Sequence, residues 1–150
     1  CLDGKWDVGV GLWFESAYVK QEYNVGEQFL GTLGMDYTFP LGSGLMVLVE
    51  HMYIDYVIPG IGLQSSSNTT ALSLSYPIGF FDNINMFATY SWEAKAPSFF
   101  LNYQHDYRVI TAYVMAYYTP STSLNVGSEE SDFVSNFTGP GLRLMLVYKH

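Results

Sequence analysis

Apolar and polar residues alternate along most of the chain, and clusters of Gly, Pro, Asn and Ser separate the alternating segments. A period of two indicates β-strands with two chemically different faces, whereas a helix would repeat every 3.6 residues. Eight such segments can be delimited: 6–15, 28–39, 45–56, 71–76, 84–93, 99–106, 109–117 and 142–149. The pattern predicts an all-β fold with about eight strands in one domain, 1–150.

The connections between these segments alternate in length. Tight turns with Gly or Pro are expected after the second, fourth and sixth segments, at 40–44, 77–83 and 105–107. Longer polar loops are expected after the others, at 20–27, 59–68, 93–97 and 119–139. Short turns at one rim and longer loops at the other are typical of antiparallel, up-and-down transmembrane β-barrels. We therefore expect a transmembrane barrel of this kind.

The composition favours a membrane environment over water. Only 13% of the 150 residues are charged, whereas 49% are hydrophobic and 17% aromatic; soluble domains carry about 25% charged residues. No run approaches the ~18 apolar residues of a membrane-spanning helix, so strands must make any crossing. The net charge of −8 argues against a nucleic-acid partner, because binding phosphates requires clustered Lys and Arg, and the sequence has no such cluster. The expected partner is the lipid bilayer, with other envelope proteins or subunits as further candidates.

The apolar set of each segment is predicted to face lipid, because the opposite set is mostly small and polar and suits a hydrated interior. The predicted lipid-facing residues are Val8, Val10, Leu12, Leu33, Leu74, Met86, Leu101, Leu144 and Leu146. Aromatic residues near the segment ends are expected at the membrane interfaces, although aromatic residues are also good strand formers in general. They are Trp6, Phe39, Trp92, Phe99 and Tyr148.

Charged residues on the other parity are predicted to line the lumen. They are Asp7, Glu15, Asp36, Glu50, Glu93, Asp106, Arg108, Arg143 and Lys149. Because unpaired charges are costly in a narrow barrel, Arg108 and Arg143 are expected to bridge several carboxylates. Eight strands leave room only for side chains, which favours a sealed polar plug. In a wider barrel the same residues would form a cation-selective ring in an open pore.

Two segments, GTLGMDYTF and the final GLRLMLVYKH, carry a resemblance of pattern to the porin-like β-barrels of bacterial outer membranes. The resemblance implies a Gram-negative outer-membrane location and a passive or structural role. Such barrels usually end on an aromatic residue, whereas here two residues follow Tyr148. A soluble lipocalin-like barrel that binds a small apolar ligand is the alternative.

No arrangement of residues typical of catalysis is found, so no enzyme activity and no cofactor are predicted. His51 and Asp55 share a face but lie about 13 Å apart along a strand, too far for a general-base pair. Glu129, Glu130 and Asp132 lack the spacing of a calcium loop. Cys1, the single cysteine, allows a lipidated N-terminus or a fragment boundary as interpretations.

Overall fold

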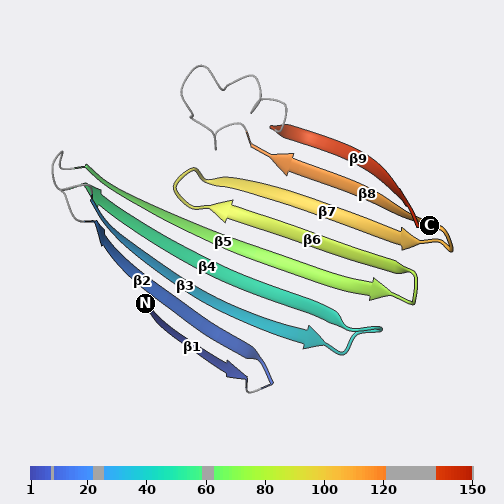
Figure 1. Cartoon of the computed structure of the whole chain (residues 1–150), viewed down its shortest axis with the longest axis horizontal. Helices are drawn as coiled ribbons and strands as arrows, with labels where there is room; N and C mark the ends of the chain where they lie inside the picture. Colours follow the sequence, from blue (N-terminus) through green and yellow to red (C-terminus); the bar gives the residue numbers. More distant parts are fainter. Residues whose placement is uncertain (8, 22–25, 59–62, 121–137, 150) are drawn as a thin grey trace.

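The computed structural model describes residues 1–7, 9–21, 26–58, 63–120 and 138–149. Within this part the chain forms nine β-strands and no helix (Figure 1). Their bounds are β1 Leu2–Asp7, β2 Gly11–Gln21, β3 Gly26–Phe39, β4 Leu45–Ile58, β5 Leu63–Ile78, β6 Asp82–Ser91, β7 Ala96–Asp106, β8 Ile110–Thr119 and β9 Gly139–Tyr148. The predicted all-β class is therefore confirmed.

All nine strands belong to one antiparallel sheet, in the order β1-β2-β3-β4-β5-β6-β7-β8-β9. Each strand pairs with the strands before and after it in the chain, which confirms the up-and-down order. The sheet is not closed into a barrel, so β1 and β9 form its two edges (Figure 1). Because direction alternates from strand to strand and nine is odd, β1 and β9 run in the same direction.

The prediction of eight strands was wrong because the first expected segment, 6–15, is two strands. β1 ends at Asp7, β2 begins at Gly11, and the two pair as a hairpin with Trp6 opposite Leu12. Gly9 in the connection has a φ of 87°, a left-handed conformation that glycine adopts without strain. The alternation of apolar residues continues through this connection, and therefore the sequence pattern did not indicate a turn.

The strands also extend further than expected at one end of the sheet. The connections at 22–25, 59–62 and 92–95 are four residues long, about as short as those at the opposite end. Only the connection between β8 and β9 is long, so the predicted alternation of loop lengths holds at one place. We call the end with connections 8–10, 40–44, 79–81 and 107–109 the turn end, and the opposite end the loop end.

Strand pairing assigns every strand residue to one of two faces, because directly opposite residues in an antiparallel pair point the same way. One cross-strand row of the first face runs through Phe14, Leu33 and His51, and another runs through Leu72, Ala88, Phe99 and Tyr118. We call this the apolar face. The other, the polar face, contains rows such as Ser75, Asn85, Asn102, Met115 and Arg143.

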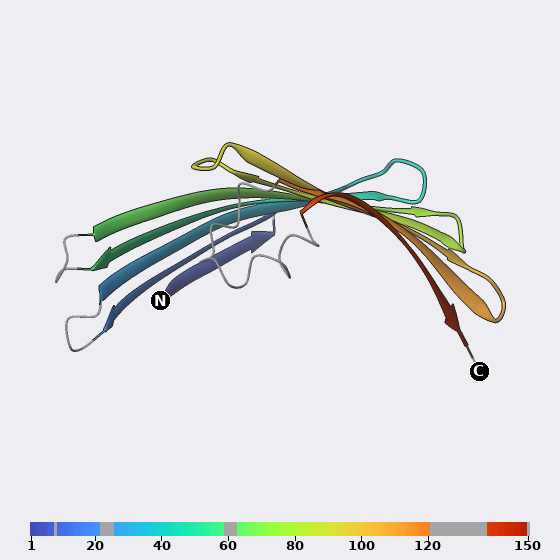
Figure 2. The same cartoon turned by 90° about the horizontal axis from the view of Figure 1, so that it is seen from above.

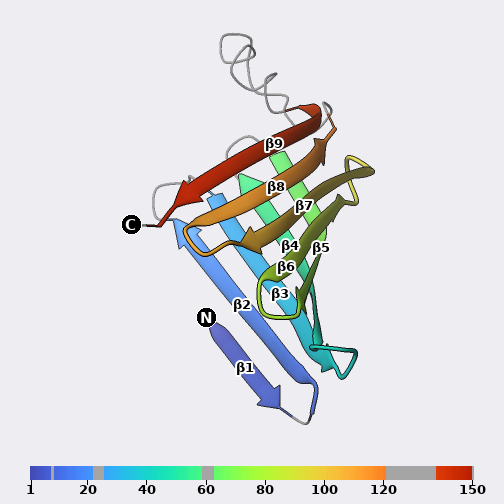
Figure 3. The ribbon, with the colours of Figure 1, turned by 90° about the vertical axis from the view of Figure 1, so that its right-hand side faces the viewer.

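The sheet is a single layer that twists and curls along its width, and no second layer of described residues covers either face (Figures 2 and 3). Among the described residues only Gly26, Ala96 and Thr111 are buried. Leu33 and Leu144, both on the apolar face, are 63% and 67% exposed. The described part of the chain thus has no hydrophobic core of the kind that stabilises a domain in water.

Two glycines on the polar face allow aromatic rings to lie flat on the sheet. A Cβ added to Gly34 would meet the Trp13 ring at 2.1 Å, and one added to Gly141 would meet the Tyr117 ring at the same distance. Each pair is directly opposite in the register of neighbouring strands. The absence of a side chain therefore seats a large ring on this face.

Replacing Gly34 with Ala is expected to destabilise the fold by about 1–3 kcal/mol, because the new methyl group displaces the Trp13 ring from a close-packed position. Urea unfolding in detergent would measure the change. The matched control is Gly31→Ala on the same strand, whose Cβ would meet only the edge of Phe29 at 3.3 Å. Equal losses in the two variants would contradict the role given to the Trp13 ring.

Candidate functional site

The most extensive feature of the sheet is an apolar band on one face that crosses β2 to β9. Its central side chains, strand by strand from β2, are Leu12, Phe14, Leu33, Met35, Val47, Val49, Leu72, Leu74, Met86, Ala88, Leu101, Val114, Ala116, Leu142, Leu144 and Leu146. Soluble monomers rarely expose a contiguous apolar patch larger than a few hundred Å². A band that spans eight strands therefore marks a surface that something apolar covers.

Polar side chains border this band at the loop end. The Lys20 Nζ and Glu27 Oε1 atoms form an ion pair at 3.0 Å between β2 and β3. Further along, Asn68 donates from its backbone N and its Nδ2 to Glu93 Oε1, at 2.5 and 2.9 Å. Trp92 Nε1 donates to Thr70 Oγ1 at 2.9 Å in the same corner. The apolar face thus becomes hydrophilic at this end of the strands.

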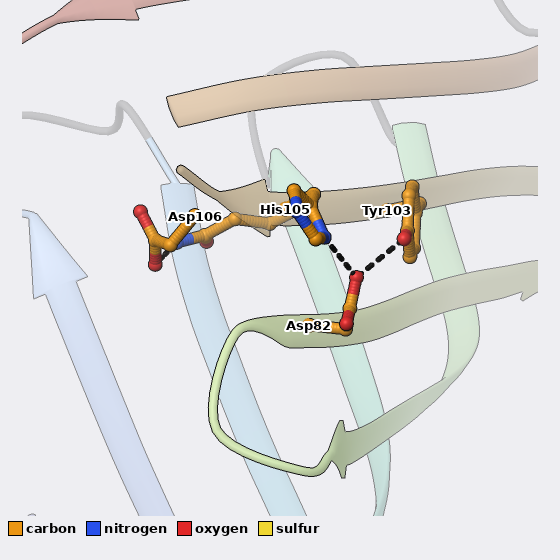
Figure 4. Close-up of polar contacts among 5 residues, drawn as sticks. Asp82, Tyr103, His105 and Asp106 are labelled. Carbon is orange, nitrogen blue, oxygen red and sulfur yellow. Dashed lines mark hydrogen bonds and ion pairs between the residues drawn. The ribbon is translucent and has the colours of Figure 1, made fainter. Parts of the chain in front are cut away.

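A second polar group borders the band at the turn end. Tyr103 donates a hydrogen bond to Asp82, and His105 Nδ1 lies 2.5 Å from Asp82 Oδ1. Figure 4 shows both side chains converging on this carboxylate from the neighbouring strand, while Asp106 points away. The register places His105 and Asp106 on opposite faces of the sheet.

The five predicted interface aromatics all belong to the apolar side of the sheet or to its rim. Trp6, Phe39 and Tyr148 lie near the turn end, whereas Phe99 and Trp92 lie near the loop end. Along β3 the apolar face runs from Phe29 to Phe39, a rise of ten residue steps or about 33 Å. If the strand were tilted by about 40°, this length would correspond to a height of about 25 Å, the apolar band of an outer-membrane barrel.

The structure also places most of the predicted lipid-facing residues together. Leu12, Leu33, Leu74, Met86, Leu101, Leu144 and Leu146 share the apolar face. Val10, by contrast, lies in the bend between β1 and β2, so its assignment to a strand was wrong. Val8 falls outside the described residues.

The predicted lumen charges divide into three groups. Asp7, Glu15, Asp36, Glu50, Asp106 and Arg143 lie on the polar face, and Lys149 directly follows β9. Arg108 lies in the turn between β7 and β8. Glu93 lies in the connection after β6, where it binds Asn68 of the apolar face. Its expected position on the opposite side was wrong because β6 ends at Ser91, before Glu93 is reached.

One ion pair on the polar face differs from the expected one. Asp106 Oδ1 accepts hydrogen bonds from Lys149 Nζ at 2.6 Å and from the buried Thr111 Oγ1 at 2.5 Å. This links the end of β9 to β7 and β8. Neither Arg108 nor Arg143 forms an ion pair within the described residues, so the prediction that these two arginines bridge several carboxylates was wrong.

The polar face of β6 to β9 also holds aromatic residues that sequence reasoning did not assign to a site. Phe87, Phe100 and Tyr117 follow one another across three strands in a single cross-strand row. β8 appeared apolar on both sides in the sequence because Tyr113, Met115 and Tyr117 occupy this face. Only the register, which the sequence pattern does not give, brings these residues together.

The chain matches no protein-family model, no curated protein and no solved structure. Within the described ranges there is no cluster of three or more His, Cys, Asp or Glu side chains suited to a metal ion. The described residues also contain no helix with the length and apolar character needed to cross a membrane. The function must therefore be argued from the two faces of the sheet.

Replacing Glu93 with Gln is expected to reduce the dependence of stability on acid. Burial raises the pKa of the Glu93 carboxyl. Hydrogen bonds from its own backbone N–H and from the side chain and backbone of Asn68 lower the pKa by more, so the net pKa lies below the usual value. This contribution is present above the unfolded pKa of about 4.3 and is lost as the pH falls through the lower folded pKa. The variant should be less stable at pH 7, with a shallower loss between about pH 5 and 3.

Thermal unfolding in detergent from pH 7 to pH 3 would measure this difference. The matched control is Glu15→Gln, because Glu15 is exposed and makes no hydrogen bond or ion pair within the part of the chain that the structure describes. A Glu93→Gln profile parallel to that of the original chain would contradict the role of the Asn68 contact.

Proposed function

We propose that this chain forms part of the wall of a transmembrane β-barrel in a bacterial outer membrane, with a non-catalytic role in passive solute passage. The observation that supports the proposal most strongly is the exposed apolar band. It is bordered at both ends by aromatic and hydrogen-bonding side chains, the arrangement that a bilayer requires at its core and its two interfaces. The opposite face, with its Ser, Thr, Asn and acidic side chains, is suited to line water.

The number of strands indicates a ring wider than this sheet. Direct pairing of β1 with β9 would be parallel, whereas bacterial outer-membrane barrels made of one chain are antiparallel and have an even number of strands. Copies inserted in the same orientation would also meet β9 to β1 in parallel. An all-antiparallel ring therefore needs an odd number of strands beyond these nine, and at least ten strands in all.

A ring of this width favours a water-filled passage over a sealed plug, because eight strands already leave an interior that side chains just fill. On the polar face acidic side chains outnumber basic ones: Glu15, Asp36 and Glu50 occupy β2 to β4, and Arg143 is the one basic residue within β6 to β9. We expect the acid surplus to favour cations over small inorganic anions in the passage.

The substitutions Leu33→Arg and Thr32→Arg test which face meets lipid. Leu33 lies near the middle of the apolar band and Thr32 is its neighbour on the polar face. An arginine at the centre of a bilayer costs about 2–4 kcal/mol in such barrels, whereas one on the water-lined side costs little. Denaturant unfolding of the protein in lipid vesicles should therefore show a large loss for Leu33→Arg alone.

A soluble lipocalin-like carrier is the alternative function, and it predicts a different result. If the apolar band were covered by protein or faced water, dispersion without detergent would be retained. Because the apolar band of such a carrier lines its interior, Leu33→Arg would be costly there too, and dispersion without detergent is therefore the result that separates the two functions. A larger loss for Thr32→Arg than for Leu33→Arg would show that the assignment of the two faces is reversed.

A further inference from the structure

A hollow of about 500 Å³ lies mainly on the polar face across β6 to β9. Three cross-strand rows build its lining. Thr89 and Ser98 form a cross-strand pair of hydroxyl groups toward the loop end, where Thr119 at the end of β8 adds a third, and Phe87, Phe100 and Tyr117 form a row of aromatic rings beside them. Met115 and Arg143 form the third row on the turn side of the rings. Apolar side chains and one cation thus line a single concavity.

The lining is suited to a flat apolar group. Because Gly141 has no side chain, the Tyr117 ring lies over β9 in the space that a Cβ at this position would occupy. This ring and those of Phe87 and Phe100 line a hollow of the size of small-molecule sites. Aromatic side chains stack on planar apolar groups, and such contacts add to the stabilisation that comes from burying apolar area.

Arg143 provides the polar recognition at the edge of this hollow. Its guanidinium forms no hydrogen bond or ion pair with any residue that the structure describes, and none of the described residues that line the hollow carries a carboxylate. The same cross-strand row continues to Asn102, whose Oδ1 is buried without a hydrogen-bond partner among the described residues. An unpaired guanidinium can bind a carboxylate through two parallel hydrogen bonds.

We propose that this hollow binds a small carboxylate with an aromatic body. The carboxylate pairs with Arg143, and the aromatic body stacks on the rings of Phe100 and Tyr117. A cationic ligand is disfavoured because Arg143 is the only charged residue among the described residues of the lining, and a ligand without charge leaves the guanidinium unpaired. The inference rests on the proposed function in one respect, that the polar face lines water and admits a solute.

Titration calorimetry with 4-phenylbutyrate would test the proposal on the protein in lipid nanodiscs. The uncharged probe 4-phenylbutan-1-ol has the same ring and chain without the carboxylate, and 4-phenylbutylamine carries the opposite charge. We expect 4-phenylbutyrate to bind at least about tenfold more tightly than either, because a hydrogen bond to a charged group contributes about 1.5–3 kcal/mol. Equal binding of the three probes, or no binding of 4-phenylbutyrate, would overturn the proposal.

Variants locate the site on the chain. Arg143→Met should weaken the binding of 4-phenylbutyrate about tenfold and leave that of the alcohol unchanged, whereas Arg143→Lys should retain part of the affinity. Phe100→Ala should weaken the binding of both probes. The matched control is Arg108→Gln, which removes a positive charge from an exposed turn outside the hollow and should change nothing. Loss of binding in this control, or full binding in Arg143→Met, would contradict the assignment.

The membrane proposal and the ligand proposal fail separately. A heat-dependent shift in gel mobility shows that each variant still folds, and single-channel currents report whether a passage is open. Binding of 4-phenylbutyrate without current would leave the ligand site and contradict the passage. Current without selective binding would support the passage and contradict the ligand site.

Discussion

The structure depends on one constraint: a single β-sheet has no interior, so its apolar face has to be covered by something other than itself. Among the described residues only Gly26, Ala96 and Thr111 are buried, and the leucines of the apolar band are mostly exposed. In water this arrangement would leave the apolar band in contact with solvent, although burial of apolar surface is the main driving force of folding. In the function that we propose, a bilayer supplies the apolar cover, and hydrogen bonds between strands satisfy the backbone.

The same constraint relates the features at the rims and edges of the sheet. Where the strands leave the apolar band, side chains such as Lys20, Glu27, Asp82 and His105 pair with one another. At the lateral edges the backbone hydrogen-bonding groups of β1 and β9 have no neighbouring strand on one side. In a hydrocarbon environment an unpaired edge is costly, and therefore a closed ring is required. The parallel directions of β1 and β9 explain why these nine strands do not close it as an antiparallel ring.

The sequence was sufficient to predict the all-β class, the antiparallel order and the grouping of Leu33, Leu74, Leu101 and Leu144 on one face, because these follow from a local period of two. It did not reveal the turn at Gly9, since Val8 and Val10 continue the apolar alternation through it. The pairing of Asp106 with Lys149 and the aromatic row of Phe87, Phe100 and Tyr117 depend on register between strands. Register is fixed by strand ends and turns, which alternation locates only to within a few residues.

The central claim is that the apolar face meets acyl chains and the polar face meets water. Spin labels placed one at a time from Phe29 to Phe39 on β3, in a Cys1→Ser background that removes the single cysteine, would test it in lipid vesicles. The account predicts that labels at odd-numbered positions collide mainly with dissolved oxygen and labels at even-numbered positions with a water-soluble nickel chelate. The reverse pattern, or equal access to the chelate at every position, would contradict it.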